Sequence, residues 1–256
     1  MEGYHTTTPI HHHAMKREYF KWYSPSLQRD MELLIFGEAG EPILFFPTRT
    51  AHFYDYEDWL VIDAMKKKIE AGKIQVCCLD SIDKESFYAR DIPPPQRILR
   101  HLQYEQYLLK EVIPLIKQMN ACPTMVAAGC SLGAYHAANI AFKYPSLFHK
   151  MVGLSGRYDL TMSMPHFEDL FEGYTDENVY YNMPSQFIPN LYDEQLIRQL
   201  KELEIIFVVG EHDVFLDNNQ TLSNALWSKG IWNALNLWDG ESHKARYWRH
   251  MVQLYL

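Results

Sequence analysis

Five consecutive residues, Gly-Cys-Ser-Leu-Gly at positions 129–133, could carry nucleophilic chemistry. An apolar stretch of strand character, residues 124–128, precedes them, and a helix-like stretch follows from near Gly133. A serine between a strand and a helix is held in a strained turn above the sheet edge, where flanking glycines leave room for neighbouring backbone. The helix N-terminus directs N–H groups and partial positive charge at the same point. The pattern predicts Ser131 as a nucleophile; the alternative is a tight turn with an inert serine.

A serine hydroxyl needs a base, and the base needs an acid that orients it. Where the nucleophile lies on such a turn, the chain order is serine, then acid, then histidine. Asp213 comes just after an apolar run at residues 205–209 and is the favoured acid, because a residue near a strand end has a fixed position. Asp217 and Asp159 remain open as alternatives.

The base is expected in the loop after the last strand. His243 follows an apolar run at residues 232–237, and His250 is the other histidine that comes after the acid candidates. Since His250 falls in a closing segment with helical spacing, we favour His243 as the base. We interpret His250, His212 and His136 as packing or surface residues.

An oxyanion hole requires two N–H donors directed at the developing negative charge. Leu132, the residue after the nucleophile, should supply one, and the loop after an early strand at residues 42–46 should supply the other. Pro47 has no N–H. Thr48 or Arg49 must therefore donate, and Thr48 is favoured.

Apolar runs of strand length alternate with helix-like segments along the chain. Runs such as residues 205–209 are apolar on both faces, which is typical of a parallel sheet covered by helices on each side. Residues 37–40, with two glycines, predict a hairpin or tight turn between antiparallel strands at the N-terminal edge. We therefore predict an α/β fold with a mostly parallel central sheet. Strands are expected at 31–36, 42–46, 74–79, 124–128, 151–154, 205–209 and 232–237, and helices at 58–71, 98–119, 135–143, 195–203, 221–229 and 246–256.

No repeat, low-complexity tract or linker divides the 256 residues, so we predict one domain at residues 15–256. Residues 1–14 are interpreted as an N-terminal leader, either flexible or not native to the protein. Their run of three histidines, residues 11–13, is interpreted as incidental, and no metal or other cofactor is predicted.

The composition excludes several classes of function. A net charge of −8 argues against a nucleic-acid partner, which requires a basic surface. No apolar run approaches the roughly 20 residues that span a bilayer, so no membrane partner is expected. The four cysteines contain no C-x-x-C pair, and the first residues lack the features of a signal peptide. We therefore expect a cytoplasmic protein with reduced cysteines.

Substrate contacts are expected from two sources. The irregular stretch at residues 157–190 is rich in aromatic residues, and Tyr174, Tyr180 and Tyr181 are candidates to border the serine. The alternative is a surface excursion that buries its own aromatics. Arg49 and Arg157 lie near predicted strand ends and are candidates to meet an acidic group of the substrate, the alternative being pairing with structural carboxylates.

Four segments carry a resemblance to the putative-esterase family of α/β-hydrolases, which contains esterase D-like enzymes, enterochelin esterases, feruloyl esterases and mycolyltransferases. They are Phe-Pro-Thr at 46–48, Gly-Cys-Ser-Leu-Gly-Ala at 129–134, Gly-Leu-Ser-Gly-Arg-Tyr-Asp at 153–159 and the loop of His243. The resemblance covers the chain from about Met15 and is greatest to bacterial members of the group.

The resemblance implies an α/β-hydrolase fold, a triad of Ser131, Asp213 and His243, and no cofactor. Many members have His-Gly or Asp-Gly where this chain has Phe46 and Pro47, which is a departure at the second oxyanion donor. We expect a serine hydrolase that cleaves a small-molecule carboxylic ester through an acyl-enzyme. A thioesterase or acyltransferase with the same triad, or a binding protein on this scaffold, remains open, and a homodimer is compatible with the aromatic surface.

Overall fold

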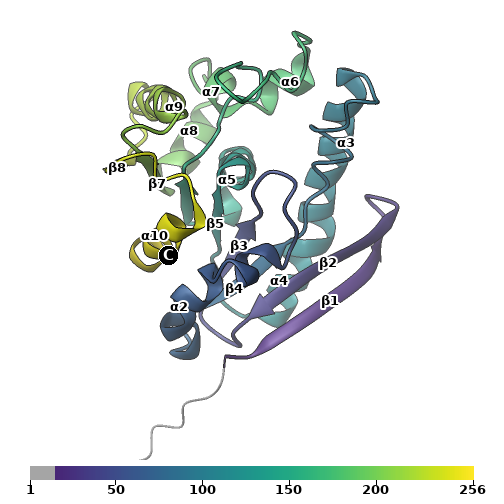
Figure 1. Ribbon diagram of the computed structural model, residues 1–256, viewed down its shortest axis with the longest axis vertical. Helices are drawn as coiled ribbons and strands as arrows, with labels where there is room; N and C mark the ends of the chain where they lie inside the picture. The colour runs from purple at the N-terminus through teal and green to yellow at the C-terminus, as the bar shows by residue number, and fades with distance from the viewer. Residues whose placement is uncertain (1–14) are drawn as a thin grey trace, which may run out of the picture.

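The computed structural model describes residues 15–256, so the predicted leader and its histidine run lie outside the described residues. Residues 15–256 form an eight-stranded sheet with helices against both faces (Figure 1). The strands are β1 (Arg17–Ser24), β2 (Arg29–Phe36), β3 (Glu41–Phe46), β4 (Ile74–Leu79), β5 (Val126–Cys130), β6 (Lys150–Leu154), β7 (Glu204–Gly210) and β8 (Ala234–Trp238). The helices are α1 (Asp55–Asp58), α2 (Val61–Glu70), α3 (Pro94–Tyr107), α4 (Ile113–Met119), α5 (Leu132–Lys143), α6 (Glu177–Tyr181), α7 (Pro184–Phe187), α8 (Glu194–Lys201), α9 (Leu216–Ser228) and α10 (Ala245–Tyr255), with a π-helical turn η1 (Leu108–Val112) and a 3-10 turn η2 (Pro145–Leu147).

The strands lie side by side in the order β1-β2-β4-β3-β5-β6-β7-β8. All neighbours from β4 to β8 run parallel, whereas β1 pairs with β2, and β2 with β4, in the antiparallel direction. The central strands are buried on both faces, which is why their sequences are continuous apolar runs. The predicted α/β fold, with a mostly parallel sheet and antiparallel strands at the N-terminal edge, is confirmed.

Of the two forms predicted for residues 37–40, a hairpin or a tight turn, the tight turn is present and the hairpin is wrong. β2 and β3 are not neighbours, because β4 lies between them and pairs with both. Gly37 and Gly40 take positive φ values of 94° and 92°, and a Cβ on Gly40 would lie 2.3 Å from the carbonyl carbon of Lys73. The tight turn therefore reverses the chain but carries it past the start of β4. As a result, β3 lies on the other side of β4 from β2. The hairpin is formed by β1 and β2, and β1 escaped prediction because its side chains alternate between exposed and half-buried positions at the sheet edge.

The single helix expected at residues 98–119 begins earlier and is interrupted. α3 starts at Pro94, where the missing N–H of proline costs nothing in a first helical turn. The chain then passes through the π-helical turn η1 and continues as α4. Because Pro114 cannot donate to the carbonyl four residues before it, one wider turn at this point keeps the helix continuous in direction.

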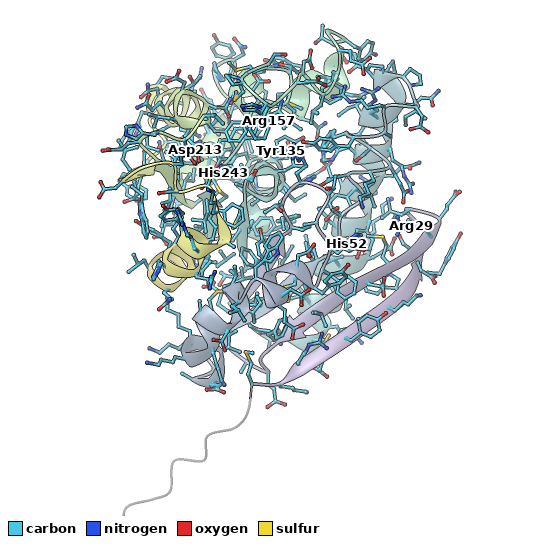
Figure 2. The ribbon with its side chains drawn as sticks, viewed as in Figure 1. Arg29, His52, Tyr135, Arg157, Asp213 and His243 are labelled. Atoms are coloured by element: carbon cyan, nitrogen blue, oxygen red, sulfur yellow. The ribbon has the colours of Figure 1, made fainter. Side chains whose placement is uncertain are left out.

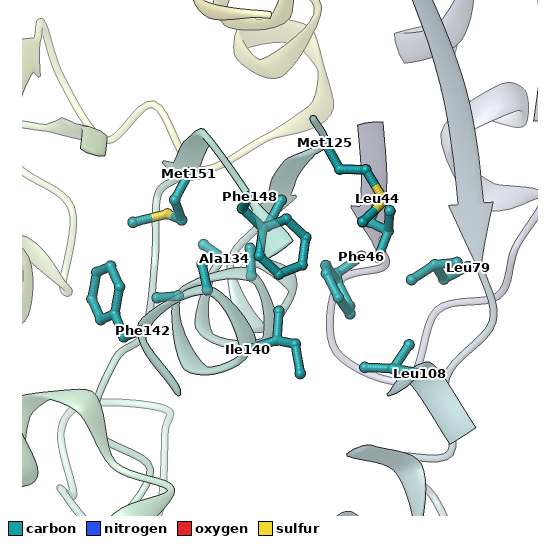
Figure 3. Close-up of a cluster of buried hydrophobic side chains, with 14 of the residues drawn as sticks. Leu44, Phe46, Leu79, Leu108, Met125, Ala134, Ile140, Phe142, Phe148 and Met151 are labelled. Carbon is teal, nitrogen blue, oxygen red and sulfur yellow. The ribbon is translucent and has the colours of Figure 1, made fainter. Parts of the chain in front are cut away.

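Two layers of apolar side chains fill the space between the sheet and the helices. Leu44 and Phe46 of β3 belong to the same buried cluster as Ala134 and Phe142 of α5 (Figure 3). On the opposite face, α2 and α10 cover a second cluster that includes Phe45. Alternate residues of β3 thus enter opposite layers, as the period of a strand requires, and the sheet is fixed between them. No helix within residues 15–256 is long and apolar enough to cross a membrane.

Candidate active site

Ser131 occupies the turn between β5 and α5. Its φ of 56° and ψ of −117° are values that residues other than glycine seldom adopt, so the turn is strained. A Cβ on Gly129 would lie 2.3 Å from the carbonyl carbon of Gly133, and one on Gly133 would lie 2.2 Å from the carbonyl oxygen of Phe46. Both positions therefore require glycine if β3, β5 and α5 are to pack this closely. The strained strand-to-helix turn expected from the sequence is present.

A chain of hydrogen bonds joins Ser131 to residues from two distant parts of the sequence. The Nε2 atom of His243 lies 3.1 Å from Oγ of Ser131, and its Nδ1 atom lies 2.9 Å from Oδ2 of Asp213. Figure 2 shows Asp213 and His243 next to each other. A carboxylate can only accept, so Nδ1 donates to Asp213, and the neutral ring presents the lone pair of Nε2 to the serine hydroxyl. Ser131 therefore has a proton acceptor in place.

Burial and a backbone donor fix the Asp213 carboxylate. Its side chain is 0% exposed, and its second oxygen, Oδ1, accepts a hydrogen bond of 2.9 Å from the N–H of Phe215. Each carboxylate oxygen thus has its own donor. This is the rigid environment that an orienting acid requires, because the imidazole can turn only as far as its partner allows.

The loops of Asp213 and His243 leave the same edge of the sheet as the turn of Ser131, since β5, β6, β7 and β8 are successive parallel neighbours. The two loops also contact each other through their backbones. The N–H of His212 donates to the carbonyl of Gly240 at 2.9 Å, and a Cβ on Gly210 would lie 2.3 Å from that same carbonyl oxygen. The distance between the two loops is therefore set by main-chain contact.

The alternative acids and histidines lie elsewhere. Asp217 is exposed in the first turn of α9. Oδ1 of Asp159 accepts hydrogen bonds from the N–H and the hydroxyl of Thr161. His212 and His250 are exposed. The structure brings none of these side chains into the hydrogen-bonded chain that ends at Ser131.

The two expected oxyanion donors, Leu132 and Thr48, line one cavity of about 330 Å³ with Ser131 and His243. Leu132 is the first residue of α5, so its N–H has no partner within the helix. Among the described residues, neither this N–H nor that of Thr48 donates to another protein atom. Both donors are thus free to meet a ligand in the cavity.

A buried carboxylate that the sequence analysis did not single out holds the loop of Thr48. Oδ2 of Asp83 accepts the N–H of Thr50 at 3.0 Å, and Oδ1 lies 3.3 Å from Nε2 of His136 on α5. His136, interpreted as a packed residue, is buried and has this partner. Asp83 comes shortly after the end of β4, but a single acid outside a motif carries no sequence signal for this role.

Aromatic side chains and two arginines form the cavity walls. Arg49 and Arg157, both predicted as substrate contacts, lie there. Trp248 packs against His243 with ring centroids 5.8 Å apart, and its indole N–H donates to Oγ of Ser155 at 3.2 Å. Trp59, Tyr88 and Phe167 complete the walls. Tyr88 comes from a segment without regular structure, for which no sequence pattern predicted a role.

Tyr174, Tyr180 and Tyr181 do not line the cavity of Ser131. Tyr180 and Tyr181 line a separate cavity of about 500 Å³ at the C-terminal end of α5, whereas Ser131 precedes the N-terminal end of this helix. The 12 residues of α5 place about 18 Å between the two ends. The hydroxyl of Tyr174 donates to Asp176 at 2.8 Å. The aromatic-rich segment after β6 therefore contributes Phe167, and not these tyrosines, to the wall near Ser131.

Comparison with solved structures shows the fold. A ferulic acid esterase superposes with a TM-score of 0.74 at 16% identity, over 94% of this chain and 96% of that chain. An S-formylglutathione hydrolase from Agrobacterium tumefaciens gives 0.73 at 15% identity over 94% and 92% of the two chains. A fluorophosphonate-binding serine hydrolase from Staphylococcus aureus gives 0.71 at 14% identity over 94% and 96%. These proteins share the α/β-hydrolase fold with this chain.

Comparison of sequences gives the family. Among curated proteins, none matches the chain. The family model described as putative esterase matches residues 56–249, a span that begins before the turn of Ser131 and ends after the loop of His243. The chain therefore belongs to the putative-esterase family of α/β-hydrolases and is a carboxylic ester hydrolase.

Proposed function

We propose that this esterase is a serine hydrolase in which Ser131 is the nucleophile, His243 the general base and Asp213 the orienting acid. The observation that carries the proposal is the unbroken chain of hydrogen bonds from Ser131 through His243 to Asp213, which begins at a strained turn. Along this chain of hydrogen bonds, a nucleophile, a base and an orienting acid follow each other as nucleophilic catalysis requires.

The first half of the reaction forms an acyl-enzyme. Nε2 of His243 takes the proton of the Ser131 hydroxyl as Oγ attacks the ester carbonyl, and the N–H groups of Leu132 and Thr48 stabilise the oxyanion of the tetrahedral intermediate. The buried Asp213 carboxylate stabilises the imidazolium. As the carbon–oxygen bond to the alcohol breaks, His243 returns the proton to the departing alkoxide.

The second half releases the acid. A water molecule enters beside His243, which takes its proton while the oxygen attacks the acyl carbonyl. Collapse of the second tetrahedral intermediate returns the proton to Oγ of Ser131 and frees the carboxylic acid. No metal or organic cofactor takes part in this scheme.

Substitution of the nucleophile tests the proposal. Ser131→Ala should abolish both the turnover of 4-nitrophenyl acetate and covalent labelling by a fluorophosphonate. The matched control is Cys130→Ala, because Cys130 is the neighbouring nucleophile but burial raises the pKa of its thiol. The control should keep turnover and labelling. A wild type that shows neither, or a Ser131→Ala variant that keeps both, would contradict the proposal.

Thioesters and acceptor alcohols can use the same three residues. Oxygen esters and thioesters with identical acyl groups, assayed with and without added methanol, separate the alternatives. We expect a higher kcat/KM for oxygen esters and the free acid as the main product. Thioester preference, or methyl ester as the main product in dilute methanol, would assign a different acyl-transfer reaction to this triad.

A further inference from the structure

A second cavity opens beside the one that contains Ser131. It has a volume of about 420 Å³ and shares Arg49, Tyr88, Arg157 and Phe167 with the first cavity, of about 330 Å³. Because four side chains line both, the two hollows adjoin. A substrate with its ester group at Ser131 can therefore extend one of its ends between the two arginines.

Arg157 is buried, with 2% of its surface exposed, and it forms no salt bridge among the described residues, although the Asp159 carboxylate lies near enough to interact with its charge. Its Nη2 atom donates to the carbonyls of Met162, at 3.1 Å, and Glu168, at 2.5 Å, while its Nε atom is buried without any hydrogen-bond partner. A guanidinium stays charged in proteins, and a buried unpaired charge is costly. The protein therefore leaves part of the charge and donor capacity of Arg157 unsatisfied.

Arg49 is exposed and also forms no salt bridge within residues 15–256. Its guanidinium carbon lies 5.7 Å from the centre of the Phe167 ring and 5.8 Å from that of Tyr88. The guanidinium carbon of Arg157 lies 5.7 Å from the same Phe167 ring. One aromatic ring thus contacts two cations, and both cations line both cavities.

The remaining charged groups of the second cavity neutralise each other. Glu168 pairs with Arg90 at 3.1 Å, and Arg90 also pairs with Glu172 at 2.9 Å. Tyr88 contributes no negative charge at neutral pH, because burial raises the pKa of its phenol. Arg49 and Arg157 therefore form a positive site next to the nucleophile in a protein whose net charge is −8. Such a field attracts an anion and orients it.

We propose that the ester cleaved at Ser131 carries an anionic oxygen group, a carboxylate or a phosphate, that binds between Arg49 and Arg157. The inference rests on the proposed function, since it places the anion relative to the ester that Ser131 attacks. The planar guanidinium forks suit these groups, and charge-assisted hydrogen bonds to them are stronger than neutral ones. The neutral part of the substrate would contact the aromatic walls.

Matched esters test the charge requirement. The acetates of 4-hydroxybenzoic acid and of 4-hydroxyphenylphosphonic acid carry an anion on the alcohol part, and 4-carbamoylphenyl acetate is their neutral counterpart. The mono-4-nitrophenyl ester of adipic acid carries the anion on the acyl part. The methyl ester of its free carboxyl group is the neutral counterpart. We expect kcat/KM to be about tenfold higher or more for an anionic member, since charged hydrogen bonds contribute about 1.5–3 kcal/mol. The preferred probe distinguishes carboxylate from phosphate and the acyl part from the alcohol part.

Variants test the residues. Arg49→Gln should reduce the anionic-to-neutral ratio of kcat/KM by about tenfold, and Arg49→Lys should restore part of it. Arg49 is exposed, so its replacement leaves the core intact. The control is Arg198→Gln, which removes the same charge from an exposed pair with Glu194 on α8 and should leave the ratio unchanged.

The outcomes separate this inference from the proposed function. Equal or faster cleavage of the neutral member in both sets, or an unchanged ratio in Arg49→Gln, would overturn the anion site while the triad stands. Failure of all the esters, together with absence of fluorophosphonate labelling, would overturn the proposed function and the anion site with it.

Discussion

α5 has a cavity at each of its ends, and the two cavities differ in what accompanies their aromatic side chains. At the N-terminal end, aromatic rings stand beside Ser131, His243 and two arginines that form no salt bridge within residues 15–256. At the C-terminal end, Tyr180 and Tyr181 line the larger cavity with mostly apolar neighbours. Lys143, the charged residue that α5 contributes there, is paired with Glu105. The richer aromatic cavity is thus the one without candidate reacting groups.

The difference follows from the direction of the helix and of the strands. The N-terminal end of α5 presents free N–H groups and partial positive charge, which can stabilise an oxyanion, whereas its C-terminal end presents carbonyl oxygens. The carboxyl ends of the parallel strands lie at the same side as the N-terminal end, so the loops after β7 and β8 meet it. Position relative to these ends, and not aromatic content, distinguishes the candidate active site.

Asp213→Asn is expected to have the largest effect on activity at the N-terminal cavity. An amide in this position can hold the wrong imidazole tautomer, with the proton on the nitrogen that faces Ser131. We expect kcat for 4-nitrophenyl acetate to fall by about 10⁴-fold, the size seen when the acid of a serine triad is replaced in this way. The exposed rival Asp217 provides the control, and Asp217→Asn should keep kcat. The reverse result would move the acid to α9.

Asp83→Asn should have the next largest effect. Loss of the negative charge weakens the hold on Thr50 and loosens the loop that carries Thr48, so we expect kcat to fall by about 10²-fold with little change in KM, near the lower limit for removal of an oxyanion donor. Asp80→Asn is the matched control, because Asp80 is a nearby buried carboxylate that contacts His52 instead. A change confined to thermal stability would assign Asp83 a purely structural role.

His101 on α3 packs against the middle of α5 and should make the stability of the protein depend on pH. It is buried against Tyr135 and Asn139, and burial lowers its pKa well below 6.5. The folded state therefore keeps the ring neutral while the unfolded chain takes up a proton below pH 6.5, so the free energy of unfolding should fall with decreasing pH. The loss should reach about 1.4 kcal/mol per pH unit. The free energy of unfolding, measured with denaturant at a series of pH values, should fall less steeply below pH 6.5 in His101→Gln than in the wild type. An unchanged slope would contradict this origin.

The smallest effect on activity is expected from the C-terminal cavity. Replacement of both Tyr180 and Tyr181 with alanine should leave kcat/KM within about twofold for every ester tested, because the cavity is a helix length away from Ser131. Phe167→Ala is the contrasting variant and should change the relative kcat/KM among esters. A change in preference for the tyrosine variant alone would make the C-terminal cavity part of the substrate site.

Prediction from the sequence succeeded where local pattern decides structure. The apolar runs of β4 and β7 and the glycine–serine turn are local signals, and they sufficed for the α/β fold and for the positions of Ser131, Asp213 and His243 at strand ends. The false hairpin at Gly37–Gly40 had the right local turn but the wrong neighbour, because β4, which separates the two strands, comes much later in the chain. Pairing of distant strands depends on tertiary packing that no short window contains.

The cavity walls were predicted less completely for a related reason. Trp59, Tyr88, Phe167 and Trp248 come from four separate segments, and the direction of each side chain depends on how these segments pack. The aromatic density around Tyr180 and Tyr181 suggested a substrate wall, but these residues lie beyond the far end of α5. Asp83 was missed since a single buried acid outside a motif has no sequence signature.

The contact between Gly210 and the carbonyl of Gly240 has a consequence for how this enzyme can change over evolution. The loops of the proposed acid and base are spaced by main chain against main chain. From the long segment between β6 and α8, Ser155 also holds the loop of His243, because its hydroxyl donates to the carbonyl of Ser242 at 3.1 Å. That segment supplies Phe167 and part of the second cavity. Beyond Ser155, changes in the part of this segment that lines the two cavities can thus alter substrate preference while the main-chain spacing of the two loops is kept. Gly210 itself is the position at which such drift should be least tolerated.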